Sequence, residues 1–277
     1  MQHNPIIIPY PLAGSVMAFS TTRHGGVGKG NYAELNINPY CGDAQEAVSA
    51  NRKALARELG VDDGSIVLAH QVHGDRCLAV TDDLLRCPEA DRMAAVEGYD
   101  ALMTQLHGVC IGVSTADCIP VLLHDPIHQA VAAVHAGWRG TVRRIVGKTL
   151  RTMADAYGTR PEEVRAVIGP GISLARFEVG QEVYDRFAEA HFDMDRIAKR
   201  YAKWHLDLPL CNLLQLQEAG GVTTSLPQTS ARLTEWTTIS QPGDWERLPD
   251  AYSLASSCVE HGQLPAGLYV VFLYPES

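Results

Sequence analysis

Three short apolar runs follow one another closely in the middle of the chain, and they constrain the fold more than any other feature. They span residues 109–114, 118–123 and 130–135, with only a few residues between one run and the next. Runs of this length between turn signals are typical of buried strands. We therefore expect three buried β-strands in this part of the chain.

Segments with helical and strand patterns surround these runs. A helix is predicted from Thr141 onward, because apolar residues recur there at helical spacing. Another is predicted over 43–59, with Asp43 and Glu46 in a capping-box pattern and Gly60 as its stop. Further helices are predicted over 181–190, 195–203 and 210–219, and further strands over 16–21, 65–73, 166–168 and 268–273. This mixture indicates a mixed α/β (α+β) fold and leaves the strand order open.

Charge and cysteine content limit the class of protein. The formal net charge is −9, from 23 Lys and Arg against 32 Asp and Glu, which argues against a nucleic-acid binder. The seven cysteines are an odd number and contain no CxxC pair, which fits a reducing compartment. The N-terminus lacks a signal-peptide pattern, and no run reaches the roughly 18 apolar residues that span a membrane. We expect a cytoplasmic protein without membrane or nucleic-acid partners.

Three candidate metal ligands lie at strand ends or in the adjacent turns. They are His73 in HQVHGD, Cys118 in STADC and His135 in VHAGWRG. Catalytic zinc sites use three such ligands and leave a fourth coordination position open. A lone cysteine is more often an inert buried residue, and a lone histidine is more often structural. Spacing by itself therefore leaves both interpretations open.

Two other histidine patterns are less indicative of a metal site. On the predicted strand 65–73, His73 lies on one face and His70 on the other. A fourth ligand from His70 is therefore not expected, which argues against a closed structural zinc site. His124 and His128 lie four residues apart, but Pro126 between them favours a surface loop.

Several longer motifs together resemble a known family. They are FSTTRHGGVGKGNYAELN at 19–36, CGD at 41–43, HQVHGD at 70–75, YDALMT at 99–104, STADCIPVLLHD at 114–125, VAAVHAGWRGT at 131–141 and IGPGIS at 168–173. In this order they resemble the laccase-domain family, also called the multicopper-polyphenol-oxidase-like family. The resemblance implies a zinc-dependent purine nucleoside phosphorylase with adenosine deaminase activity. It also implies a single domain over 1–277, with mixed β-sheets flanked by helices.

The resemblance implies roles for particular residues. His73, Cys118 and His135 would hold the zinc ion and carry catalysis, and Arg23 and Asn36 would line the substrate pocket. Asp117 is a further catalytic candidate next to Cys118, and Arg23 or Arg139 is a candidate for binding phosphate oxygens. For Asp117 and Arg139, an ion-pairing or capping role is equally consistent with the sequence. The implied small-molecule partners are phosphate and the nucleosides adenosine, inosine, guanosine and methylthioadenosine, in a monomer or small homo-oligomer.

The C-terminal part departs from the family pattern. Leu233 and Thr234 stand where the family often has a Cys-Thr pair, and the stretch 251–258 lacks the arginine of the family's corresponding segment. The resemblance therefore does not extend to the role of that arginine, and it leaves the substrate preference of this chain open.

Three other functions remain open from the sequence. A copper-dependent polyphenol oxidase is one, although the HxH pairs of true multicopper oxidases are absent and copper would be an alternative metal. Another is a cysteine hydrolase that edits peptidoglycan precursors, with Cys118 as nucleophile beside His73 or His135. The last is a non-enzymatic, metal-stabilised interaction module.

Overall fold

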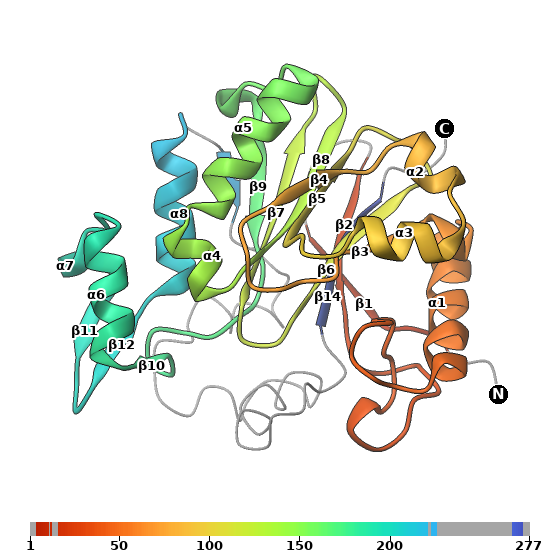
Figure 1. Cartoon of the computed structure of the whole chain (residues 1–277), viewed down its shortest axis with the longest axis horizontal. Helices are drawn as coiled ribbons and strands as arrows, with labels where there is room; N and C mark the ends of the chain where they lie inside the picture. The colour runs from red at the N-terminus through yellow and green to blue at the C-terminus, as the bar shows by residue number, and fades with distance from the viewer. Residues whose placement is uncertain (1–3, 11, 13–15, 221–222, 226–267, 274–277) are drawn as a thin grey trace.

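The computed structural model describes residues 4–10, 12, 16–220, 223–225 and 268–273, and Figure 1 shows their arrangement. Two larger β-sheets and a smaller one account for the strands of this part. The six-stranded sheet has the order β13-β9-β7-β8-β5-β4. Its strands are β13 (Thr223–Ser225), β9 (Arg165–Ile168), β7 (Ile119–Asp125), β8 (Ala130–Ala136), β5 (Ala101–Thr104) and β4 (Cys77–Ala79).

The five-stranded sheet has the order β1-β2-β14-β6-β3. Its strands are β1 (Ile7–Tyr10), β2 (Met17–Thr21), β14 (Leu268–Leu273), β6 (Cys110–Thr115) and β3 (Ile66–Leu68). Its pairs are antiparallel except that between β3 and β6, which is parallel. The sheet therefore combines segments from both ends of the chain with two from its middle.

The two larger sheets pack face to face, and helices cover their outer faces. Along β7, Val121 and Leu123 pack with the helix-covered core, whereas Leu122 packs with the core between the sheets. This alternation has the period of two that a strand imposes on its side chains. Every residue of β7 and β8 is buried, which explains why these strands are almost uniformly apolar in sequence.

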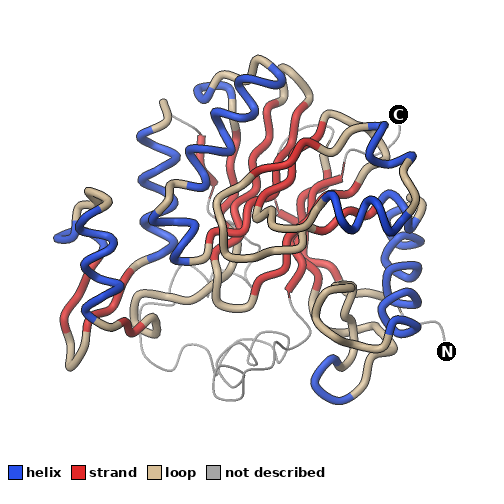
Figure 2. The backbone as a smooth tube through the Cα atoms, in the orientation of Figure 1, coloured by secondary structure: helices blue, strands red, loops and turns tan. Residues whose placement is uncertain are grey.

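Helices lie on opposite sides of this sandwich (Figure 2). The six-stranded sheet is covered by α4 (Trp138–Val142), α5 (Ile145–Tyr157) and α8 (Leu208–Glu218). The five-stranded sheet is covered by α1 (Gln45–Leu59), whose Leu55 and Leu59 pack against Phe19 and Cys110. The observed fold is a mixed α/β fold with several sheets flanked by helices, as predicted.

The remaining elements are short and lie outside these layers. They are η1 (Gly30–Tyr32), η2 (Asp63–Ser65), α2 (Asp82–Arg86), α3 (Glu89–Ala95), η3 (Pro161–Glu163), β10 (Glu178–Val179), α6 (Gln181–Glu189), α7 (Met194–Ile197), β11 (Ala198–Arg200) and β12 (Trp204–Leu206). The strands β10, β12 and β11 form the small sheet, which lies beside α6 at one end of the molecule (Figure 1). Among the described residues, no helix has both the length and the apolar character that crossing a bilayer requires.

Several predicted elements were wrong in their extent. The strand predicted over 65–73 ends at Leu68, because the chain turns away and only His70 makes a further bridge, to Glu97. The helix predicted over 195–203 stops at Ile197, because the next residues pair as β11 with β12. These long-range pairings override the local patterns.

Helix boundaries also differ from the sequence prediction. The helix predicted from Thr141 is split into α4 and α5, because Arg144 has a left-handed backbone (φ 63°) at the start of α5. The N-cap of α1 is Ala44 rather than Asp43, whose carboxylate instead accepts hydrogen bonds from Asn36 and from the Ala44 N–H. The departures expected at Leu233 and over 251–258 lie outside the described residues.

Candidate metal centre and substrate pocket

The side chains of His73, Cys118 and His135 converge at one edge of the six-stranded sheet. One potential ligand atom from each lies within 4.8 Å of the other two. Cys118 directly precedes β7 and His135 is the penultimate residue of β8, where it pairs with Pro120. Since β7 and β8 are antiparallel neighbours, the start of one and the end of the other meet at the same edge. His73 comes from the loop that joins β3 to β4.

A buried carboxylate, Asp100, organises two of these three ligands. It accepts a hydrogen bond from Nδ1 of His135 at 2.8 Å, and the backbone N–H of His135 donates to the Asp100 carbonyl at 2.7 Å. The same carboxylate accepts the backbone N–H groups of Val72, His73 and Gly74 at 3.2, 2.9 and 2.7 Å. Asp100 thereby holds the loop that carries His73, and because it engages Nδ1, Nε2 is the nitrogen of His135 that can face a metal.

Sequence reasoning did not single out Asp100, although it stands in the YDALMT motif. The sequence signal for Asp100 was its position, as an acidic residue immediately before an apolar run. In the structure this run is the strand Ala101–Thr104, which is completely buried. Burial alone raises the pKa of Asp100, but the hydrogen bonds from His135 and from the backbone N–H groups of Gly74 and Val72 lower it below its ordinary value. Asp100 is therefore ionised and holds its donors firmly.

The backbone of the His73 loop is held in an uncommon conformation. His73 has φ 58°, in the left-handed region that few residues other than glycine adopt. The hydrogen bonds to Asp100 hold this conformation, and it directs the imidazole toward Cys118 and His135. The rings of His73 and His135 meet edge to face, with centroids 4.9 Å apart.

Gly137 leaves room for the three ligands. A Cβ atom at this position would lie 2.9 Å from Sγ of Cys118 and 3.1 Å from Cδ2 of His73. The first contact is shorter than real Cβ atoms show and the second is tighter than most, so a larger residue would push against the ligands. The glycine of the HAGW motif is thus a packing requirement of this cluster.

The electrostatics of the cluster favour a cysteine thiolate. Burial raises the pKa of the Cys118 thiol, but hydrogen bonds with His135 and His73 outweigh it and lower the pKa to about 6. Burial lowers the pKa of His135, but its hydrogen bonds with Asp100 and Cys118 raise it to about 9. A thiolate is the form in which cysteine binds metals and acts as a nucleophile.

The donor set fits a zinc ion with an open coordination position. One sulfur and two imidazole nitrogens are ligands that zinc accepts, and three protein ligands are typical of catalytic rather than structural sites. His70 was predicted to face away from His73, but both line the same pocket, because the strand ends before them. His70 is nevertheless outside the metal cluster and stacks on Tyr40, with ring centroids 4.3 Å apart.

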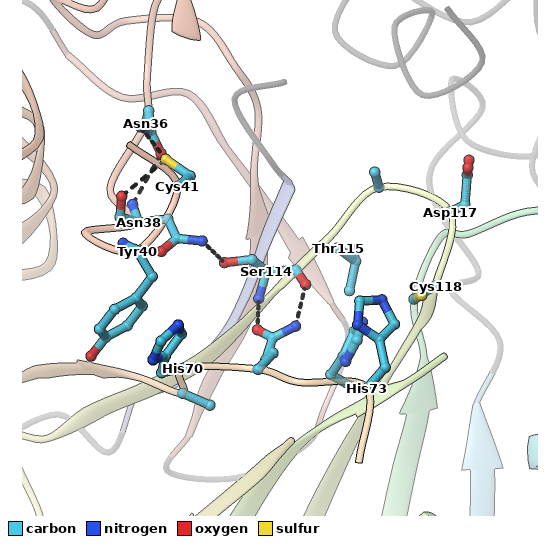
Figure 3. Close-up of a pocket in the computed structure, with 14 residues that line it drawn as sticks. Asn36, Asn38, Tyr40, Cys41, His70, His73, Ser114, Thr115, Asp117 and Cys118 are labelled. Atoms are coloured by element: carbon cyan, nitrogen blue, oxygen red, sulfur yellow. Dashed lines mark hydrogen bonds between the residues drawn. The ribbon is translucent and has the colours of Figure 1, made fainter. Parts of the chain in front are cut away.

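A cavity of about 270 Å³ opens beside the cluster. Figure 3 shows Tyr40 and His70 at one side of it and His73 and Cys118 at the other. Gln71 also lines the cavity, and its side-chain amide exchanges two hydrogen bonds with the backbone of Ser114, at 2.7 and 2.8 Å. The cavity thus joins a candidate metal site to a wall of aromatic rings and side-chain amides.

The structure places the other predicted site residues in two groups. Asn36 and Asp117 line the pocket. Asn36 donates to the Asp43 carboxylate at 2.9 Å, and burial raises the pKa of Asp117. Arg23 and Arg139 do not line it. The guanidinium of Arg23 donates to the Ala33 carbonyl, and that of Arg139 is exposed on α4 over the Trp138 ring.

The fold and the site together define a class of protein. It is an α/β sandwich with a His–Cys–His cluster at one edge of a sheet, and the cluster leaves one metal coordination position open. The chain belongs to the family described as multi-copper polyphenol oxidoreductase laccase, whose model matches residues 17–244. This confirms the resemblance indicated by the motifs.

Relatives in this family carry enzyme names. The chain is 44% identical over 209 residues to a purine nucleoside phosphorylase of Bacteroides thetaiotaomicron, covering 74% of this chain and 77% of that protein. It is 42% identical over 209 residues to adenosine deaminase RL5 of an unknown prokaryotic organism, covering 74% and 79%.

Solved structures share the fold. YlmD from Geobacillus stearothermophilus superposes with a TM-score of 0.78 at 27% identity, covering 95% of this chain and 93% of that one. The protein YfiH of Bacillus licheniformis has a TM-score of 0.80 at 24% identity, covering 100% and 98%, which is a likeness of fold.

Proposed function

We propose that this chain is a zinc-dependent purine nucleoside phosphorylase with adenosine deaminase activity. The observation that carries the proposal is the three-donor cluster of His73, Cys118 and His135 at the side of a pocket. Relatives named for both activities support it. The expected substrates are adenosine, inosine, guanosine and methylthioadenosine, with phosphate as the second substrate of phosphorolysis.

The residues of the site would divide the work between metal binding and substrate binding. His73, Cys118 and His135 would hold the ion, and Asp100 would keep the Nδ1 proton of His135 in place. When bound, zinc would supply a Lewis acid that polarises a substrate oxygen or activates water. The ring pair of Tyr40 and His70 and the amides of the pocket are suited to holding a nucleoside.

The two reactions differ in the bond that breaks. In phosphorolysis the bond between C1′ of the ribose and the purine nitrogen breaks, a phosphate oxygen bonds to C1′, and the purine takes up a proton. In deamination a water oxygen replaces the amino group at C6 and ammonia leaves. Asp117 lines the pocket next to Cys118 and is our candidate for a proton-transferring group. The phosphate-binding roles of Arg23 and Arg139 stay predictions.

Substitution of the ligands tests the proposal. His73→Ala and Cys118→Ala should abolish ribose 1-phosphate formation from inosine and remove most of the metal bound at this cluster. Products are measured by mass spectrometry with and without phosphate, and metal by elemental analysis. Cys87→Ala, which removes a thiol at the end of α2, is the matched control. It should keep both the bound metal and the formation of ribose 1-phosphate. Full activity and full metal content in both ligand variants would refute the assignment.

The identity of the metal is a separate part of the proposal. The family description names copper, and copper binds such donors more tightly than zinc. We favour zinc because the sequence contains no HxH pair of the kind that feeds a multicopper cluster. Protein expressed without added copper should contain zinc and catalyse the phosphorolysis of inosine, with oxidation of phenols appearing only after copper loading. Nucleoside activity that depends on copper would contradict this.

A second candidate function, a cysteine hydrolase, is favoured by one observation. The Cys118 thiol, with a pKa of about 6 beside two imidazoles, resembles an activated nucleophile. Hydrolysis of peptidoglycan-precursor amides that survives a chelator but is abolished by iodoacetamide would favour it over a metal enzyme. If neither nucleoside phosphorolysis nor amide hydrolysis is detected in any assay, the metal-stabilised interaction module is favoured.

The remaining expectations concern the protein in the cell. We propose that it works in the cytoplasm as a monomer or small homo-oligomer and binds small molecules rather than nucleic acid. Light scattering during size-exclusion chromatography would measure the oligomeric state, and cell fractionation would test the location.

A further inference from the structure

A second group of metal-ligating side chains lies far from the first. It consists of Asp125, His128 and Glu163, whose ligand atoms all lie within 4.8 Å of one another. Asp125 ends β7, His128 stands in the turn between β7 and β8, and Glu163 ends η3 just before β9. Because β7 is fully extended from Cys118 to Asp125, the two clusters are about 20 Å apart.

The geometry of this group is compact and its donors are oriented. Nδ1 of His128 lies 2.8 Å from Oδ2 of Asp125 and 3.9 Å from Oε2 of Glu163. The other carboxylate oxygen of Asp125 accepts the backbone N–H groups of Ile127 and His128 at 2.9 and 3.0 Å. These bonds direct Oδ2 toward the two other side chains. The Asp125 side chain is completely buried, and that of Glu163 is only 13% exposed.

One oxygen of this group lacks the partner that its burial requires. Oε1 of Glu163 is paired with Arg160, but Oε2 is buried without a hydrogen-bond partner. The distance of 3.9 Å to His128 is too long for a hydrogen bond. A buried carboxylate oxygen with no donor costs free energy, and a bound cation would remove that cost.

We propose that Asp125, His128 and Glu163 form a second, structural metal site that binds a divalent transition-metal ion such as zinc. Two carboxylate oxygens and one imidazole nitrogen are a suitable donor set for such an ion. The ion replaces the proton on Nδ1 of His128, and Nε2 keeps its proton. It ties the turn between β7 and β8 to η3. This site does not depend on the proposed enzymatic function.

Zinc stoichiometry tests the second site. The metal-free full-length protein is dialysed to equilibrium against Zn²⁺, and bound zinc per chain is measured by elemental mass spectrometry. Wild type should bind two ions, and Glu163→Gln and His128→Asn one each. The asparagine retains a donor in place of Nδ1 and so keeps the hydrogen bond to Asp125. Glu162→Gln, which changes an exposed neighbouring glutamate, should still bind two.

Cys118→Ala separates this proposal from the proposed function. It should bind one zinc ion, at the second site, and the double variant with Glu163→Gln should bind none. Zinc should raise the thermal unfolding midpoint of Cys118→Ala but not that of the double variant. This comparison does not use His128→Asn, so it remains valid even if that variant folds poorly. Absence of zinc from a folded Cys118→Ala, or an unchanged zinc count in Glu163→Gln, would overturn the second site.

Discussion

At the scale of single residues, the site depends on one carboxylate as much as on the three ligands. Asp100 orients the His135 ring and holds the backbone of the His73 loop, so one side chain sets the positions of two donors. Hydrogen bonds from such carboxylates to metal-binding histidines set ring orientation and ligand basicity. The charge of Asp100, and not only its shape, is therefore expected to matter.

Asp100→Asn should weaken metal binding at the His73–Cys118–His135 cluster by about 10-fold to 100-fold. The amide keeps the volume but loses the negative charge, and it places a donor where an acceptor is needed. Equilibrium dialysis with zinc measures the affinity, and phosphorolysis of inosine measures the activity. Asp62→Asn, on an exposed aspartate, should change neither. Wild-type zinc affinity in Asp100→Asn would show that the carboxylate is dispensable.

The Cys118 thiol should titrate at unusually low pH in metal-free protein. Because its pKa is lowered to about 6, the thiolate should form as the pH rises through 6, well below the value near 8.5 of an ordinary cysteine. Thiolate absorbance near 240 nm, taken as the difference between wild type and Cys118→Ser, measures this titration. His135→Asn should move the midpoint upward, since His135 supplies a main stabilising hydrogen bond. A wild-type midpoint above pH 8 would contradict the proposed electrostatics.

At the scale of elements, the site is made where β7 starts, β8 ends and α4 begins. The antiparallel pairing of β7 with β8 places Cys118 beside His135, and the N-cap of α4, Gly137, packs directly on both ligand side chains. The close approach of this turn leaves no room for a methyl group.

Gly137→Ala should therefore impair the site while leaving the fold intact. The new Cβ would approach Cys118 Sγ at 2.9 Å, so metal affinity and nucleoside turnover should both fall at least tenfold. Gly147→Ala in α5 is the control, because its Cβ would meet only Arg151 at an ordinary 3.6 Å. That change should leave activity unaltered and stabilise the protein by up to about 1 kcal/mol. Equal activity of the two variants would exclude the steric explanation.

At the scale of the whole molecule, the two larger sheets enclose a core of buried apolar side chains between them. Leu122 of β7 lies at its centre, packed with Ile111 and Val113 of β6, and it is completely buried. The metal cluster combines a loop between the two sheets with the edge of one of them. The packing of the sheets against each other therefore also positions the ligands.

Leu122→Ala should cost about 2–5 kcal/mol of unfolding free energy, because it leaves a cavity between the sheets. Urea denaturation followed by circular dichroism measures the loss. Ile6→Ala, which truncates a side chain that is 53% exposed, should change stability by less than about 0.5 kcal/mol. A loss below about 1 kcal/mol for Leu122→Ala would show that the sandwich can close the cavity.

The sequence by itself determined the mixed α/β class, the buried strands β6, β7 and β8, and the family to which the chain belongs. It also pointed to His73, Cys118 and His135 as candidate ligands. Apolar runs and long motifs are local properties, so they can be recognised in the sequence alone. A strand that is buried along its whole length is apolar along most of that length.

Only the tertiary structure decided how far each element extends and what surrounds the ligands. The strand predicted over 65–73 ends at Leu68, because Asp100, 27 residues from His73, holds the following loop in a conformation that no local pattern encodes. The grouping of His128 with Glu163 likewise depends on two segments that are distant in sequence. Such contacts arise when strands pair and sheets pack, and periodicity within one segment carries no record of them.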